Sequence, residues 1–233
     1  MPDDQKNNLT PKKRITVSGY GESLYEVKKS KFIGYCKPVL SAQEANDFVD
    51  EIRKKHADAR HNVYAWILKK EISLQKYSDD GEPSGTAGLP VMSVLTKNEI
   101  TDCAIVVTRY FGGILLGKGG LVRAYTKAAA LALKEAGPKV MEMCAIMNFK
   151  VDYSSYDRIV FEIKNHGYVI SRTDYGADID IDVTVPLDLV EDFKDMMVQV
   201  SNGTVEAVKT GETEAETEEI RVEFDETDED DIP

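Results

Sequence analysis

The stretch CAIVVTRYFGGILLGKGGLVRAY, from Cys103 to Tyr125, decides the fold of the first part of the chain. Its first six residues form a continuous apolar run, which is typical of a strand buried on both faces. Five glycines follow, and they permit positive φ angles and close approach of the backbone. Beyond them, apolar residues recur at helical spacing as far as Ala136. The stretch therefore predicts a buried strand, a tight glycine-rich turn and a long helix beginning near Gly119.

The start of this helix carries the wrong sign of charge for a helix on its own. Lys118 and Arg123 lie near its N-terminus and Lys127 follows, although the positive end of the helix dipole favours acidic residues. Gly119 and Gly120 leave backbone N–H groups of the first turn free to donate. We interpret the junction as an anion-binding surface, since a phosphate or carboxylate would offset the repulsion. The alternative is that the glycines serve only close packing and the cations are solvated.

Part of the junction resembles a nucleotide-binding loop. The spacing from Gly112 to Gly117-Lys118 matches a P-loop, but Gly119 stands where that loop needs Ser or Thr to hold magnesium. The residues Ile114 to Leu116 also form an apolar knuckle, where nucleotide loops are usually small and polar. Nucleotide hydrolysis is therefore disfavoured, and no cofactor is predicted.

A second motif, YSDDGEPSGTAGLP (77–90), holds three carboxylates within four residues. Asp79, Asp80 and Glu82 would suit a hard metal ion, or a hydrolase that uses His61 as a general base. The same segment is also rich in turn signals, and its carboxylates could instead cap the next helix. No calcium-loop spacing or His/Cys set completes a metal site, so we assign no metal ligand and no catalytic residue.

Composition indicates a cytoplasmic protein without a membrane segment. The longest apolar run is far shorter than the ~20 residues that span a bilayer, and the polar N-terminus lacks the apolar core of a signal peptide. The three cysteines suit reduced thiols rather than disulfides or zinc. The net charge of −12 is concentrated in residues 212–233, whereas residues 1–137 carry 21 basic and 16 acidic side chains, a net charge of +5.

The pattern along the chain predicts an α+β protein with two domains. A flexible leader is expected over residues 1–14, and Gly137-Pro138 ends the long helix and marks a boundary. The second part reads as strand, helix, strand, strand, helix, strand, which is the ferredoxin-like order. Its last strand is expected at 204–208, and the acidic residues 212–233 are expected to be a disordered tail. Strands of the first part are expected over 15–27, 31–40, 62–69 and 103–108, with helices from Ser41, over 91–97 and after the glycines.

Both glycine-rich segments are similar to the hallmark motifs of the IMPACT/YigZ family: YSDDGEPSGTAGLP (77–90) and VVTRYFGGILLGKGGLVRAY (106–125). The flanking SKFIG (30–34) and HNVYAW (61–66) resemble its lesser motifs. The resemblance implies that residues 15–137 have the fold of the second domain of ribosomal protein S5. It also implies that residues 138–211 form a ferredoxin-like domain similar to the last domain of elongation factor G.

The resemblance also implies a role in translation. Eukaryotic family members restrain activation of an initiation-factor kinase and carry an additional N-terminal domain, which is not expected here because only about 14 residues precede the first strand. The bacterial-type architecture implies a protein associated with RNA or the ribosome. Two alternatives stay open: the hydrolase above, and a protein-interaction module. In the second, carboxylates alternating along one sheet face (Asp178, Asp180 and Asp182) would bind a basic partner.

We therefore expect the basic first domain to contact RNA through the glycine-rich junction. A base could stack on Tyr110 or on Phe111. The residues expected to contact RNA phosphates are Arg109, Tyr110, Lys118, Gly119, Gly120, Arg123 and Lys127.

Overall fold

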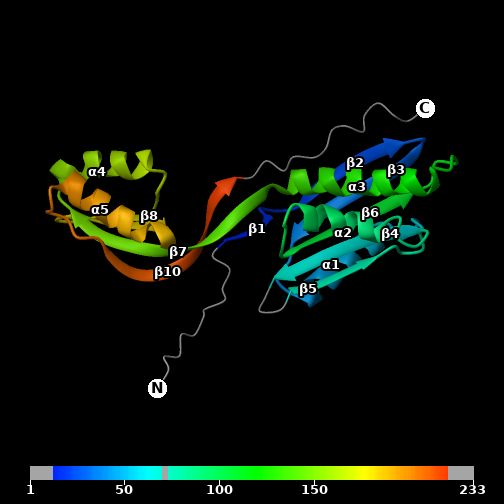
Figure 1. Ribbon diagram of the computed structural model, residues 1–233, viewed down its shortest axis with the longest axis horizontal. Helices are drawn as coiled ribbons and strands as arrows, with labels where there is room; N and C mark the ends of the chain where they lie inside the picture. The colour runs from blue at the N-terminus through cyan, green and yellow to red at the C-terminus, as the bar shows by residue number, and fades with distance from the viewer. Residues whose placement is uncertain (1–12, 70–72, 220–233) are drawn as a thin grey trace, which may run out of the picture. The chain divides into compact units, whose positions relative to one another are not determined.

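The computed structural model describes residues 13–69 and 73–219, with the side chains of Glu218 and Glu219 left out. The chain forms two compact units: the first contains the residues up to Val140 and those from Glu218 onward, and the second is Met141–Thr217. Figure 1 shows that each unit combines helices with its own sheet. The predicted α+β class, with an S5 domain 2-like unit followed by a ferredoxin-like unit, is confirmed.

The first unit is built on a five-stranded sheet in the order β2-β3-β6-β4-β5, with every neighbouring pair antiparallel. The strands up to the glycine-rich junction are β1 (Lys13–Val17), β2 (Gly21–Val27), β3 (Ser30–Pro38), β4 (His61–Lys69), β5 (Ser73–Ser78) and β6 (Cys103–Tyr110). The helices of this unit are α1 (Ala42–Lys55), α2 (Gly88–Lys97) and α3 (Gly117–Ala136).

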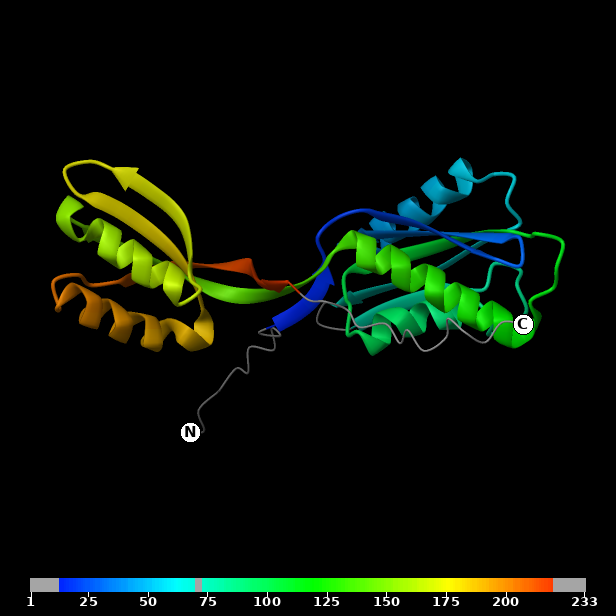
Figure 2. The same ribbon diagram turned by 90° about the horizontal axis from the view of Figure 1, so that it is seen from above.

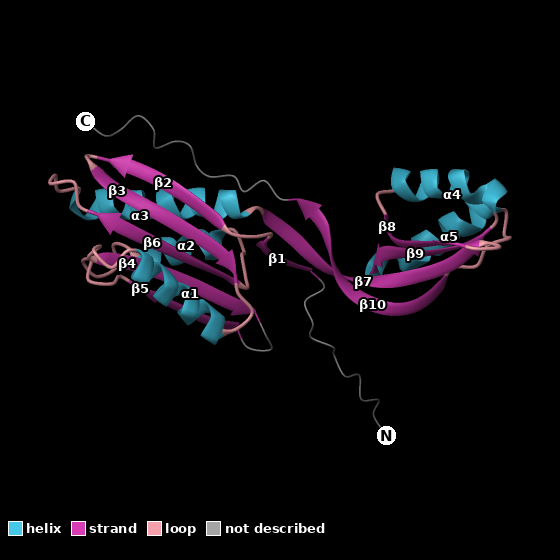
Figure 3. Cartoon of the chain, turned by 180° about the vertical axis from the view of Figure 1, so that it is seen from behind, coloured by secondary structure: helices cyan, strands magenta, loops and turns pink. Residues whose placement is uncertain are grey.

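Helices cover both faces of this sheet. Figures 2 and 3 show α1 on one face and the pair α2 and α3 on the other. The central strand β6 is therefore buried on both sides, as its apolar run predicts. Ile105 and Val107 pack toward α2 and α3, whereas Ala104 and Val106 pack toward α1. This alternation also decides where the polar residues at the end of β6 point.

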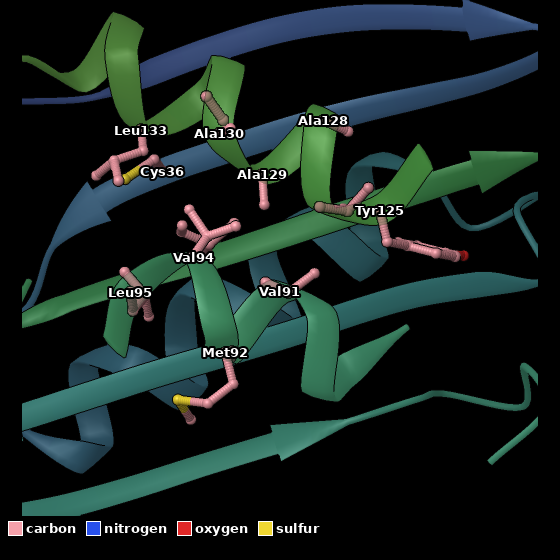
Figure 4. Packing of buried hydrophobic residues seen from close by; sticks show 14 of the residues in the cluster. Cys36, Val91, Met92, Val94, Leu95, Tyr125, Ala128, Ala129, Ala130 and Leu133 are labelled. Carbon is pink, nitrogen blue, oxygen red and sulfur yellow. The ribbon is translucent and has the colours of Figure 1, made fainter. Parts of the chain in front are cut away.

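Small residues bring α3 close to the sheet. A Cβ at Gly34 of β3 would lie 2.5 Å from the carbonyl oxygen of Ala128, so only glycine fits there. Figure 4 shows Ala129 and Tyr125 of α3 facing Val94 and Val91 of α2 across the same core. The ring of Tyr125 meets Phe32 edge to face, at 5.1 Å between centroids. Close packing at this end fixes the helix whose N-terminus follows the glycine-rich loop.

The second unit has the ferredoxin-like order of strands. Its sheet runs β10-β7-β9-β8. Ile159 of α4 and Phe193 of α5 belong to the core beneath the sheet, and the Asp152 side chain accepts from the Ser155 N–H to cap α4. The elements are β7 (Pro138–Val151), α4 (Tyr153–Asn165), β8 (Val169–Tyr175), β9 (Ile179–Pro186), the 3-10 turn η1 (Leu187–Leu189), α5 (Val190–Ser201) and β10 (Val208–Glu219).

The C-terminal prediction is wrong over its first part. The last strand is β10 rather than 204–208, and it includes residues 212–219 of the expected disordered tail. Residues 211–217 alternate between half-buried (Gly211, Thr213, Ala215, Thr217) and exposed (Glu212, Glu214, Glu216) positions. The expectation of disorder rested on the lack of large apolar side chains in this segment. Backbone pairing with β7 does not need such side chains, so the segment forms a strand. The rest of the expected tail, 220–233, lies outside the described residues.

The N-terminal expectations need two smaller corrections. Strand β1 begins at Lys13, inside the expected leader, and the rest of that leader (1–12) lies outside the described residues. The strand expected over 15–27 is interrupted at Ser18, whose N–H donates to the carbonyl of Gly137 (2.8 Å) instead of a neighbouring strand. Strand β5 was not expected, because its sequence SLQKYS shows no alternation of apolar and polar residues.

Candidate functional site

The glycine-rich junction lies where β6 leaves the sheet and α3 begins. The first turn of α3 contains no acidic residue, and its N-cap, Leu116, provides no side-chain hydrogen bond. The side chains of Lys118 and Arg123 are exposed and that of Lys127 is half-buried. The helix begins at Gly117 rather than near Gly119, so all three cations lie on the helix itself.

A second segment brings two more cations to the junction. Lys28 and Lys29 form the two-residue turn between β2 and β3, with φ angles of 47° and 63°. Such turns ordinarily favour Asn and Gly, because both central residues need positive φ. Gly112 packs directly on this turn: a Cβ there would lie 2.0 Å from the carbonyl carbon of Lys29. The Gly112 N–H also donates to Ser30 Oγ (3.1 Å).

We call Lys28, Lys29, Lys118, Arg123 and Lys127 the basic rim. Lys28 and Arg123 line one small hollow of about 30 Å³, together with Gly120 and four apolar residues. This volume admits water-sized groups but no nucleotide. In the part of the chain that the structure describes, no member of the basic rim forms an ion pair. The charge of the rim is therefore free to meet an anionic partner on the surface.

The expected role of Arg109 as a phosphate contact is wrong. Its side chain is only 8% exposed, and its Nη1 donates to Glu82 Oε1 at 2.7 Å. Glu82 also accepts from the hydroxyl of Tyr125 (2.8 Å), and burial followed by the charge of Glu82 raises the pKa of Tyr125 above its ordinary value. A buried cation needs such a partner because desolvation is costly. Arg109 therefore ties the 77–90 segment to β6 and α3.

Tyr110 points to the opposite face of the sheet. Its hydroxyl donates to Asp58 Oδ1 (2.8 Å) and lies 2.9 Å from His56 Nδ1. Burial and the hydrogen bond to Asp58 raise the pKa of Tyr110 to about 12. Because side chains alternate along a strand, Arg109 and Tyr110 cannot act side by side. Of the two aromatic residues expected to stack, Phe111 is the exposed one, at 56%.

The structure gives Asp79 a capping role. Its carboxylate accepts from the N–H groups of Gly85, Ala87 and Gly88 at 2.8–3.0 Å. Burial alone would raise its pKa, but these hydrogen bonds hold the pKa of Asp79 below its ordinary value. This confirms the alternative in which a carboxylate of the motif caps the next helix, which is α2.

The other residues of the second motif do not converge on one ligand. Asp80 accepts from the Asn62 N–H (2.7 Å) and from Arg53 Nη2 (3.0 Å). The Nδ1 of His61 donates to the carbonyl of Asp80 (2.9 Å), while its Nε2 lies 4.0 Å from Glu82 Oε1. Among the described residues, no group of three or more His, Cys, Asp or Glu side chains is placed to hold a metal ion. The described residues therefore offer the hydrolase alternative no cluster that could hold its metal ion.

The acidic face expected in the second unit is only partly neutralised, since the single guanidinium of Arg172 meets three carboxylates. Arg172 donates through Nη2 to Asp180 (2.8 Å) and through Nε to Asp182 (2.6 Å), and it also bonds to Asp174. The Arg172 hydrogen bond lowers the pKa of Asp182. Only Asp178, just before β9, is an exposed member of the predicted set. The face therefore keeps a net negative charge, and the protein-interaction alternative stays a prediction.

Comparisons with known proteins match both units. The Impact N-terminal domain family matches residues 28–133, and a domain of unknown function, DUF1949, matches residues 149–204. The IMPACT family member YvyE of Bacillus subtilis is 36% identical over 198 residues, 85% of this chain and 91% of that protein. This chain belongs to the IMPACT family. The family member YigZ of Escherichia coli is 32% identical over 200 residues, 85% of this chain and 95% of that protein.

A solved structure extends the likeness of this IMPACT family member to three dimensions. A crystal structure of a hypothetical protein has a TM-score of 0.54 and 29% sequence identity, and covers 86% of this chain and 98% of that chain. The described residues contain no helix that is long and apolar enough to cross a membrane.

Sequence reasoning identified the cations of the basic rim that lie on α3 but missed those of the Lys28-Lys29 turn. The signal was present as the dipeptide Lys28-Lys29 between two strands that pair antiparallel. Contact between that turn and Gly112 is a long-range feature, which spacing along the chain does not reveal.

Proposed function

We propose that this IMPACT family protein is a translation-associated regulatory protein that binds RNA or the ribosome through the basic rim. The observation that carries the proposal is the meeting of two cationic segments, the Lys28-Lys29 turn and the N-terminus of α3, around an uncapped helix end. The process, translation, is what the family resemblance implies. A cytoplasmic location is part of the same proposal.

Electrostatics supports an anionic partner. Lys118 lies in the first turn of α3, against the positive end of the helix dipole, and no acidic side chain of that turn compensates it. Phosphate groups would compensate both the side chains and the free N–H groups of the helix end. Five cations without ion pairs suit contacts to successive phosphates, which position a nucleic acid without reading its sequence. Affinity that rests on such contacts falls as salt concentration rises.

Co-sedimentation of the full chain with ribosomes, and binding to structured RNA, test the proposal. The double variant Lys118→Ala/Arg123→Ala removes two exposed cations without touching the core. The matched control is Lys54→Ala, an exposed lysine on α1, which covers the other face of the sheet. We expect the double variant to bind RNA about tenfold more weakly or worse, because each charged contact contributes on the order of 1 kcal/mol, and the control to bind normally.

Ribonuclease treatment of the captured partners distinguishes those that RNA holds from proteins that bind directly. If partners captured by the full chain persist after ribonuclease treatment and the double variant still binds RNA normally, the basic rim is not an RNA-binding surface. Loss of partners with ribonuclease, together with loss in the double variant, supports the proposal.

A further inference from the structure

We infer that Phe111 is a stacking platform for one unpaired nucleobase, so that the basic rim selects single-stranded or looped RNA over duplex. The inference rests on the proposed function and names the class of RNA that the same surface takes. It derives from the arrangement of Phe32, Arg109 and Phe111, which the sequence alone does not predict.

The three side chains form a stack that runs from the core to the surface. The guanidinium carbon of Arg109 lies 5.4 Å from the ring centroid of Phe32 and 5.6 Å from that of Phe111. Phe32 is fully buried, whereas Phe111 is 56% exposed. The guanidinium is held in place by Glu82 at 2.7 Å. A cation–π contact stabilises the position of the ring, so Phe111 lies against a cation that Glu82 holds by an ion pair.

The backbone around Phe111 is also constrained. Its neighbour Gly112 packs on the carbonyl of Lys29 and donates its N–H to Ser30 Oγ. An aromatic ring that is already ordered loses little conformational entropy when a base stacks on it. The same contact places the backbone next to Phe111 against the Lys28-Lys29 turn, whose cations can meet the phosphates that flank a stacked base.

The neighbouring side chains define which ligand fits. Ile114 and Leu115 are 43% and 82% exposed, but they are aliphatic and offer no flat π face. Tyr110 is held by Asp58 on the other side of the sheet. One exposed aromatic face on a cationic surface suits a single splayed-out base. In a duplex the bases are already stacked on each other, so only the phosphates remain to be contacted.

Two variants of Phe111 test the inference in the full chain. The probes are a single-stranded RNA oligonucleotide and a blunt RNA duplex of the same length and composition, measured at the same salt. We expect Phe111→Leu to weaken binding of the single strand about tenfold and to leave duplex binding unchanged. Leu115→Ala is the matched control, since it truncates an exposed apolar side chain that does not stack, and it should bind both probes as the original chain does.

Phe111→Trp gives a direct optical readout. We expect this variant to keep the single-strand preference and its fluorescence to be quenched by the single strand but not by the duplex. The native Trp66 is buried at 3% exposure and provides a constant background. Thermal unfolding of each variant shows whether the domain is folded.

The outcomes separate this inference from the proposed function. If Phe111→Leu binds both probes as tightly as the original chain, or weakens both equally, base stacking at Phe111 is wrong while salt-dependent RNA binding stands. If the original chain binds neither probe and no ribosomes, the proposed function fails as well. Binding of vesicles or of a protein that depends on Phe111, without binding of RNA, overturns both.

Discussion

Arg109 shows how one side chain can be assigned to the wrong role when its strand is ignored. A motif rich in glycine and cations suggests that every cation in it meets the ligand. Yet Arg109 belongs to β6, where alternate residues face opposite helices, and it points inward to Glu82. Applying the two-residue period to the end of the strand would have separated it from Tyr110.

Removal of Arg109 should destabilise the first unit. We expect Arg109→Ala to lower the free energy of unfolding by about 3–5 kcal/mol, because Glu82 would remain as an uncompensated buried charge. Urea unfolding measures the change, with Arg60→Ala as an exposed control. Stability close to that of the original chain would show that the Arg109–Glu82 pair is not a buried structural contact.

Asp79 makes a stability contribution that depends on pH. The pKa of Asp79 is lowered in the folded state, so its contribution is present above the unfolded pKa of about 3.9 and is lost as pH falls through the folded pKa. We expect Asp79→Asn to be less stable than the original chain at neutral pH, by about 1 kcal/mol. The difference should shrink below about pH 4. A difference that stays constant from pH 7 to pH 3 would mean that the charge of Asp79 does not matter.

At the scale of elements, periodicity predicted most of the fold. The buried strand β6, the long helix α3 and its end at Gly137, and the ferredoxin-like order of the second unit follow from local patterns. The edge strands of the sheets were harder to predict from the sequence. Strands β5 and β10 carry polar side chains and owe their existence to backbone pairing with β4 and β7, which no local pattern encodes.

The glycine-rich loop and the β2–β3 turn should act as one element. Gly112→Ala would place a methyl group 2.0 Å from the backbone of Lys29. We expect it to cost about 1–3 kcal/mol of stability by overpacking and to weaken RNA binding, since the two halves of the basic rim would separate. Thermal unfolding and RNA titration measure the two effects.

Gly119→Ala is the matched control for this element. A Cβ at Gly119 meets nothing closer than Arg123 Nη1 at 3.9 Å, and the residue lies in a helix. We expect its stability to be unchanged or higher by up to about 1 kcal/mol, because alanine restricts the unfolded chain. Equal losses in both glycine variants would refute the idea that Gly112 is a specific contact point.

At the scale of the whole molecule, charge is distributed unevenly along the chain. The net charge of −12 taken alone argues against a nucleic-acid partner, yet residues 1–137 carry +5 and the basic rim lies within them. A modest positive charge predicts binding that is weak and strongly salt-dependent. Family membership and both folds could be predicted from the sequence, whereas the composition of the rim needed the three-dimensional contact between two distant turns.

The salt dependence of RNA binding tests the central claim most directly. The slope of log K against log salt concentration is measured for the original chain, for Lys118→Ala/Arg123→Ala and for Lys54→Ala, with one single-stranded RNA. We predict that the double variant has a slope shallower by about 0.7 for each lost phosphate contact, and that Lys54→Ala has the original slope. Identical slopes in all three proteins would contradict the assignment of RNA binding to the basic rim.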